Sequence, residues 1–392
     1  MMFRVMSSRW GQVRRRRDRR GPSDTKGEVT SGPSVGGTTP AVGEDGTVPS
    51  TPAPLAVVGG RLATRLVDVT HDLAALDSAG FWAVVLPFSG PPVCARFADV
   101  RPARPWPGPP WQGPEPAEWR SSLDRVAYED AVRRIRSAIE AGDVYQVNLT
   151  RRLSAPVGAT ADVAALGAAL ATGNPAPFSA VVRLPSAGVQ VASASPERFL
   201  ARDGDRIRSS PVKGTATSAD RLLPKDRAEN VMIVDLVRND LGRVCEWGSV
   251  TVPELLQVEV HPGLVHLVST VEGRLRPGCG WAEAVAATFP PGSVTGAPKL
   301  AALDHIAALE PVARGVYCGA VGWVDADRGQ GELNVAIRTF WIDEGQLHFG
   351  TGGAITWDST PDGEWQETEL KARRLLQVAS GRSVGVGPSG HG

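Results

Sequence analysis

The middle of the chain carries a clear helical pattern. Tyr128, Val132, Ile135 and Ile139 follow one another at intervals of four, three and four residues. This spacing places the four side chains on one face of a helix. Gly142 stands where such a helix is expected to stop. The pattern therefore predicts an amphipathic helix that packs one face on a core.

Two segments predict strands. Residues 81–88 form a nearly continuous apolar run, which is typical of a buried strand. Residues 143–153 alternate, with Gln146, Asn148 and Thr150 on one face and apolar side chains on the other. A strand with amides and a hydroxyl on one face meets solvent or lines a polar pocket. The segment alone favours solvent.

Two later segments predict helices that open with carboxylates on one face. Asp226 and Glu229 are three residues apart, and Glu364, Glu367 and Lys371 recur at helical spacing. Such faces are usually solvated surface. One or two carboxylates completed by water and an anionic substrate are also what Mg²⁺ prefers. The spacing alone leaves both interpretations open.

Glycine-rich segments are the remaining local signal. Neither residues 291–296 nor residues 350–353 match a phosphate-binding loop. Both segments are interpreted as turns. The alternative interpretation is that their backbone N–H groups bind the carboxylates of a ligand. Residues 334–339 alternate like a strand.

Composition excludes some classes of protein. The chain has 392 residues, 42% of them hydrophobic, with 42 basic and 42 acidic side chains. A balanced charge gives no reason to expect nucleic acid or an anionic membrane as partner. No apolar run approaches the ~18 residues that a membrane helix needs. Four scattered cysteines favour reduced thiols and a cytoplasmic protein.

The composition also predicts the domain organisation. Residues 1–55 are rich in Gly, Pro, Ser and Thr and are expected to form a disordered leader. Its run of arginines at 14–20 is interpreted as solvated, against a nucleic-acid or membrane contact. Residues 56–380 are expected to form one catalytic domain, and 381–392 a flexible tail.

Ordered segments of the sequence carry a family resemblance. They are Tyr145-Gln-Val-Asn-Leu149, Ser195-Pro-Glu-Arg-Phe199, Pro211-Val-Lys-Gly-Thr215, Lys225-Asp-Arg-Ala-Glu-Asn230, Ile233-Val-Asp-Leu-Val-Arg-Asn-Asp-Leu241, Ser293-Val-Thr-Gly-Ala-Pro-Lys299, Ala336-Ile-Arg-Thr339, Gly350-Thr-Gly-Gly353 and Glu367-Thr-Glu-Leu-Lys371. The set resembles the chorismate-utilising enzymes, and most of all aminodeoxychorismate synthase component I. The resemblance implies an α+β fold like that of anthranilate synthase component I, with two packed, largely antiparallel sheets flanked by helices.

The resemblance also implies roles for individual residues. Glu229 and Glu367 look like Mg²⁺ ligands, with Glu364 and Asp226 as supporting carboxylates. The catalytic set is Glu197 as general acid, Lys213 as nucleophile and His266 near the substrate ring. The substrate-binding set is Gln146, Thr215, Thr295, Arg338, Gly352, Gly353 and Lys371.

Two positions separate the subfamilies. The relatives that use water have a lysine at the position of Gln146, and an amide cannot act as a general base. Anthranilate-forming relatives have alanine at the position of Lys213, whereas the aminodeoxychorismate type has lysine. The expected reaction is amination of chorismate to 4-amino-4-deoxychorismate for 4-aminobenzoate and folate synthesis. The alternatives are anthranilate synthase component I and a non-catalytic subunit. Ammonia is expected from a separate class I glutaminase.

Overall fold

The computed structural model describes residues 52–216, 218–222, 224–261 and 264–381. The chain divides into one unit that ends at Pro52 and a second unit that begins at Ala53. Only the second unit is described below. The expected leader lies almost wholly outside the described residues, and so does the expected tail from residue 382 onward.

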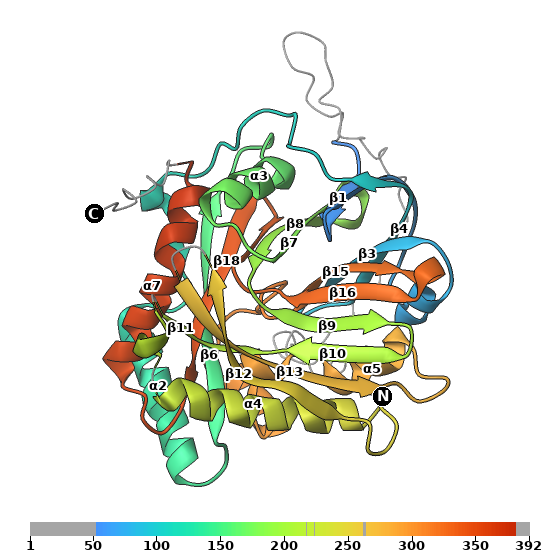
Figure 1. Cartoon of the computed structure of the whole chain (residues 1–392). Helices are drawn as coiled ribbons and strands as arrows, with labels where there is room; N and C mark the ends of the chain where they lie inside the picture. Colours follow the sequence, from blue (N-terminus) through green and yellow to red (C-terminus); the bar gives the residue numbers. More distant parts are fainter. Residues whose placement is uncertain (1–51, 217, 223, 262–263, 382–392) are drawn as a thin grey trace, which may run out of the picture. The chain divides into compact units, whose positions relative to one another are not determined.

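Antiparallel pairing joins the strands of this unit into one network (Figure 1). One half of the network runs through β6 (Gln146–Pro156), β18 (Gln346–Ile355), β17 (Thr339–Asp343), β8 (Val189–Ser195) and β7 (Phe178–Leu184). The short strands β5 (Arg120–Ser121) and β14 (Gly296–Ala297) also pair with β6.

The other half is reached through β1 (Leu55–Val58) and β2 (Arg61–Thr70). It runs through β4 (Val93–Pro102), β3 (Phe81–Leu86), β15 (Ala320–Asp325), β16 (Gln330–Val335), β9 (Arg198–Asp203), β10 (Arg206–Ser210) and β13 (Leu264–Arg274). β12 (Thr251–His261) and β11 (Val212–Ala216) both pair with β13. In Figure 1, β9, β10, β15 and β16 of this half run across the view, whereas β6 and β18 run nearly vertically.

Helices cover the outside of this network. They are α2 (Arg125–Glu140), α3 (Val163–Gly173), α4 (Pro224–Gly242), α5 (Trp281–Thr288), α6 (Lys299–Leu309) and α7 (Pro361–Ala379). α2 and α7 lie side by side next to β18, while α4 packs on β11, β12 and β13 (Figure 1). In the part of the chain that the structure describes, no helix is long and apolar enough to cross a membrane.

The main core lies between the two halves of the strand network. It combines Val147 and Val182 from the first half with Val84 and Val321 from the second. Asn334 on β16 ties the halves together, because its side-chain amide donates to the Phe178 carbonyl at 2.7 Å. The fold expected from the resemblance, helices around packed antiparallel sheets, is confirmed. Hydrogen bonding through β1 and β2 makes the two sheets continuous.

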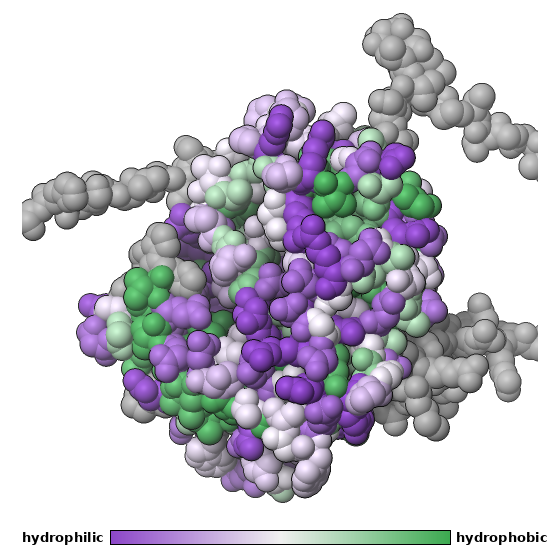
Figure 2. Space-filling model, turned by 45° about the vertical axis from the view of Figure 1, so that its right-hand side comes forward, coloured by the Kyte–Doolittle hydropathy of each residue, from purple (hydrophilic) through white to green (hydrophobic). Residues whose placement is uncertain are grey.

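A second core lies on the other face of the first half. Because alternate strand residues point to opposite faces, Val181 and Ala192 belong to this core and pack with Phe340 and Leu375 under α3 and α7. The outer surface is mostly hydrophilic in the view of Figure 2, with apolar side chains gathered in separate groups.

The local predictions compare well with these elements. The amphipathic helix predicted from Tyr128 to Ile139 is α2. It begins after Asp124, whose carboxylate caps the Ala127 N–H at 2.8 Å, and ends before Gly142, whose φ is +82°. The apolar run at 81–88 is a fully buried strand that ends at Leu86. The helix expected to open with Asp226 and Glu229 is α4, which begins at Pro224 and ends at Gly242.

Candidate active site

The pairing of β6 with β18 forms one wall of the candidate site. Gly352 lies opposite Thr150, and Gly353 lies opposite Leu149. A Cβ atom at Gly352 would lie 2.3 Å from the Leu149 carbonyl oxygen, and one at Gly353 would lie 2.7 Å from Oε2 of Glu364. The prediction of a turn at 350–353 is therefore wrong. These glycines belong to a strand, and they are required because neighbouring groups approach its backbone closely.

The polar face of β6 is buried. Gln146 is fully inaccessible, and Asn148 and Thr150 are also buried. The expectation that this face meets solvent is wrong, because β14 and α6 pack against β6. Both polar atoms of the Gln146 side chain are buried without a hydrogen-bond partner in the described structure. An unpaired buried amide is costly, and this position therefore suits contact with a polar ligand.

Two helices bring carboxylates to this wall. Glu364 and Glu367 are on α7, and Glu229 is on α4. Burial raises the pKa of Glu229, and the nearby carboxylates of Glu367 and Asp226 raise it further. The two acidic faces therefore converge on one region, as the resemblance implied. Glu364 is 5% exposed, so it does not belong to a solvated surface.

Glu364 and Glu367 differ in their partners. Burial raises the pKa of Glu364 although Ser359 donates to its Oε1 at 2.6 Å, and its Oε2 is buried with no partner among the described residues. Burial acts in the same direction on Glu367, but the ammonium of Lys371, 2.6 Å away, helps to bring its pKa below the usual value. Lys371 also donates to the Gly352 carbonyl at 3.0 Å.

The donor set fits a hard divalent cation. The described residues contain no cluster of three or more Asp, Glu, His or Cys side chains placed to hold a metal ion. Mg²⁺ usually binds proteins through only one or two carboxylates and completes its octahedron with water and substrate oxygens. The unpaired oxygen of Glu364 and the mutual repulsion of the carboxylates leave this region short of positive charge.

Lys213 lies next to the acidic region. β11 carries it, and its side chain is 13% exposed. Its Nζ is 3.7 Å from Oε2 of Glu229 and donates to the Ser293 carbonyl at 3.3 Å. The amine therefore faces the site and does not project from the surface as an ordinary lysine does.

Glu197 is close to this amine. The carboxyl group is on the loop between β8 and β9 and is 3% exposed. Burial raises its pKa to about 7, although hydrogen bonds from the Ser293 hydroxyl and the Val212 backbone, and the charge of Lys213, act in the opposite direction. A carboxyl group with this pKa keeps its proton in about half of the molecules at pH 7 and can deliver it to a leaving group.

Arg338 interrupts the strand that was expected at 334–339. β16 ends at Val335 and β17 begins at Thr339, and Arg338 between them has a φ of +50°. Burial lowers the pKa of its guanidinium, and within the described chain no carboxylate or hydrogen-bond acceptor contacts it. A desolvated cation without a counter-ion is a candidate ligand for an anionic group.

Three further predicted residues lie around this region. The carbonyl of Thr295 accepts from the Asn148 N–H at 2.7 Å, and its hydroxyl donates to the Pro291 carbonyl at 3.1 Å. His266 is buried on β13, directly opposite Thr215 of β11. The side chain of Thr215 lies outside what the structure describes.

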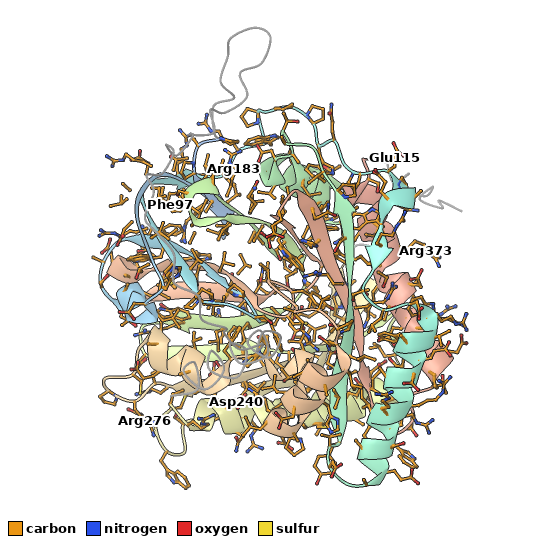
Figure 3. The ribbon with its side chains drawn as sticks, turned by 180° about the vertical axis from the view of Figure 1, so that it is seen from behind. Phe97, Glu115, Arg183, Asp240, Arg276 and Arg373 are labelled. Carbon is orange, nitrogen blue, oxygen red and sulfur yellow. The ribbon has the colours of Figure 1, made fainter. Side chains whose placement is uncertain are left out.

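Sequence reasoning quoted three relevant side chains without giving them roles. Ser293 touches both Lys213 and Glu197. Asp240 and Lys299 form a buried ion pair at 2.5 Å between α4 and α6, and Asp240 is labelled in Figure 3. The segments that contain them were part of the family resemblance, but their spacing says nothing about which residues meet.

A much larger cavity lies elsewhere among the described residues. A groove of about 740 Å³ on β2, β3 and β4 includes Arg61, Phe97 and Arg101, and none of the predicted site residues lines it. Volume therefore does not mark the candidate site, which is identified by its converging charges.

Comparison with known proteins identifies the family. Residues 97–377 match the model of the chorismate binding enzymes, and the chain belongs to this family. It is 42% identical over 283 residues to "Anthranilate synthase component 1 1" of Haloarcula marismortui, covering 68% of this chain and 57% of that protein. It is 43% identical over 271 residues to "Aminodeoxychorismate synthase component 1" of Klebsiella aerogenes, covering 66% of this chain and 59% of that protein. The matched region is thus less than two thirds of each relative.

Solved structures share the fold. The structure of a putative isochorismate synthase, DhbC, from Bacillus anthracis matches with a TM-score of 0.70 and 25% identity, over 83% of this chain and 96% of that one. Anthranilate synthase component I from Streptococcus pneumoniae matches with a TM-score of 0.67 and 24% identity, over 87% and 95%. Proteins named for different enzyme activities therefore share this architecture, and only the residues of the site can distinguish their activities.

Proposed function

We propose that this protein is an aminodeoxychorismate synthase component I, which converts chorismate and ammonia to 4-amino-4-deoxychorismate. The observation that carries the proposal is the position of Lys213. Its Nζ is 3.7 Å from Glu229 and beside Glu197, whose burial raises its pKa to about 7. An amine and a buried carboxyl group that lie close together support the proposal.

The proposed reaction has two displacement steps. The neutral amine of Lys213 forms a bond to ring carbon 2, the two ring double bonds shift from C1=C2 and C5=C6 to C6=C1 and C4=C5, and the bond from carbon 4 to its hydroxyl breaks. Glu197 protonates the hydroxyl so that it leaves as water. Ammonia then bonds to carbon 4, the bond from carbon 2 to Lys213 breaks, and the lysine amine is restored. The surplus proton of the added nitrogen returns to Glu197, so the site ends the cycle as it began.

We propose Glu229 and Glu367 as the residues that would hold Mg²⁺, with Glu364 and Asp226 supporting them. A bound Mg²⁺ would neutralise these carboxylates and attract a carboxylate of the substrate. The unpaired Oε2 of Glu364 and the raised pKa of Glu229, caused first by burial, support a cation at this place.

Chorismate is a dianion, so the site must also offer positive groups to its carboxylates. Arg338 suits this role because its buried guanidinium has no acceptor in the described structure. Lys371 is beside Glu367 and the Gly352 carbonyl, which puts a second cation at the β18 wall. The Gly352–Gly353 backbone, Gln146, Thr215 and Thr295 are proposed to complete the binding surface, and His266 to lie near the ring.

The nitrogen source is proposed to be a separate class I glutaminase, with ammonia from solution as a substitute. The resemblance covers residues 124–378 with chorismate-type segments, and none of them resembles a glutaminase. Adding a cognate glutaminase should make glutamine a usable donor. Turnover of glutamine by this chain alone would refute the proposal of a partner.

Anthranilate formation is the second candidate, and the similar identity to relatives of both names supports it. Lys213 supports the first candidate, because the resemblance gives anthranilate-forming enzymes an alanine at this position. The test is incubation with chorismate, Mg²⁺ and ammonium, followed by mass and ultraviolet spectra of the product. A non-aromatic aminated product supports the proposal, and anthranilate overturns it.

A further inference from the structure

The loop formed by residues 289–298, hereafter the Ser293 loop, is held by two buried cations. Arg314 donates from Nη1 to the Val294 carbonyl at 2.8 Å. Lys299, directly after the loop, donates to Oδ2 of Asp240 at 2.5 Å and to the Thr288 carbonyl at 2.9 Å. Arg314 holds the middle of the loop and Lys299 links the residues that flank it, which gives the loop one defined position relative to α4 and β6.

Ser293 is the residue that this loop presents to the site. It is 6% exposed. Its carbonyl accepts from the Lys213 amine at 3.3 Å, and it lines the same cavity as Glu197, where its hydroxyl lowers the pKa of that carboxyl group. One residue therefore contacts both the proposed nucleophile and the proposed acid, through two different groups.

A small cavity lies on this side of Glu197. Its volume is about 20 Å³, and Ser293, Ser209, Asp240 and Thr288 line it together with Glu197. A cavity of this size has room for about one water molecule, and its lining offers the polar partners that a buried water needs. The cavity also leaves space next to the Ser293 side chain.

We propose that Ser293 is a positioning residue that couples Lys213 to Glu197, with its carbonyl orienting the amine and its hydroxyl holding the carboxylate that remains after proton transfer. This inference rests on the proposed function and deepens it. A carboxylate formed in a dry site needs a donor to stabilise it. Ser293 provides that donor without adding a charge.

Of the groups that lower the pKa of Glu197, the Ser293 side chain acts most strongly, followed by Lys213 and the Val212 backbone. Lys213 faces Glu197 from β11, and Asp240 faces the cavity from α4 but is paired with Lys299. Arg198, the next residue along the chain, is paired with Glu332 at 2.9 Å. The Val212 N–H is the remaining donor to the carboxyl group.

The experiment compares Ser293→Ala with Ser293→Thr. The measurements are the pH profile of kcat with ammonium as donor, and the rate at which the Lys213 adduct forms on chorismate without ammonia, followed by intact-protein mass. Alanine removes the hydroxyl and keeps the carbonyl. Threonine restores the hydroxyl, and the cavity that Ser293 lines offers space beside it for an added methyl group.

Ser293→Ala should lower kcat and the adduct rate about tenfold, with KM little changed. Because the serine hydroxyl stabilises the deprotonated acid, its loss should also move the alkaline limb of the profile to higher pH. Ser293→Thr should restore the rate and the position of the limb. Ser209→Ala is the matched control, since Ser209 lines the same cavity and no hydrogen bond of the described structure joins its side chain to Lys213 or Glu197.

A wild-type profile in Ser293→Ala would overturn the inference, and so would a lower rate with the limb unmoved. If the alanine variant does not fold, Ser293→Cys keeps the volume with a weaker donor and should show the same shift. The proposed function fails separately, if the wild-type protein makes no aminated product from chorismate.

Discussion

Two regions of this protein bury charge in different ways. In the framework around the Ser293 loop, each buried charge has a partner: Arg314 contacts Glu310 at 2.6 Å, and Lys299 contacts Asp240 at 2.5 Å. In the candidate site, the Arg338 guanidinium has no acceptor in the described structure, and one oxygen of Glu364 has no donor.

The comparison separates charges that hold the fold from charges that await a ligand. Burying a charge costs several kcal/mol unless a partner compensates it. Arg314 and Glu310 meet this requirement with each other and with the backbone of β6 and the Ser293 loop. Arg338 and Glu364 in the candidate site lack such a compensating partner for their charged groups among the described residues. These groups therefore stabilise the protein only when an oppositely charged group binds.

The largest effect is expected from the metal carboxylates. Glu367→Gln or exhaustive chelation should lower turnover by about three orders of magnitude or more, because neither leaves a competent Mg²⁺ site. The melting temperature of the variant should fall only slightly, because the Glu367–Lys371 ion pair that is lost is partly exposed to solvent. Glu140→Gln, an exposed change, is the control. Near-wild-type turnover after either treatment would remove Glu367 from the metal site.

The comparison itself is tested by two arginines. Arg314→Met leaves Glu310 buried and unpaired and should lower the free energy of unfolding by about 3–5 kcal/mol. Arg338→Met removes a cation that has no partner, so the free energy of unfolding should change by less than about 1 kcal/mol while KM for chorismate rises. Urea unfolding and steady-state kinetics measure both. Equal losses of stability would show that the two regions do not differ.

Lys213→Ala should lower turnover about a hundredfold or more with little change in stability. Ammonia can still attack carbon 2 directly, so residual anthranilate-type product is expected. Intact-protein mass of the wild type, quenched on chorismate without ammonia, should reveal the adduct. Lys225→Ala is the matched control because Lys225 also acts on Glu229 and Glu367. Full activity in Lys213→Ala would end the covalent mechanism.

The smallest effect concerns pH. Burial raises the pKa of Glu197 to about 7, so the acid form predominates below that value and is lost above it. The rate should therefore fall about tenfold between about pH 6 and pH 8. A carboxyl group with a raised pKa binds more protons in the folded state, so its contribution to stability also declines as pH rises from 4.5 towards about 7. A rate that rises through this window would exclude Glu197 as the acid.

Local sequence signals were reliable where one element determines the outcome. The helix that follows Asp124 needed only an apolar face, a capping carboxylate and a glycine with positive φ. The strand at 81–86 needed only an apolar run. The same signals were misleading at 350–353, where the glycines predicted a turn. There, glycine is required because Leu149 and Glu364, which belong to other elements, approach the backbone too closely for a side chain.

The sequence by itself determined the family and the chemical groups: a carboxyl at Glu197, an amine at Lys213, and acidic pairs on two helices. Only the tertiary structure decided that the polar face of β6 is buried at Gln146, that the two acidic faces converge, and that Ser293 lies between Lys213 and Glu197. The physical reason is that desolvation and partner choice depend on groups supplied by distant segments. A periodic pattern records how a residue is placed on its own element, and the solvent it loses depends on what that element packs against.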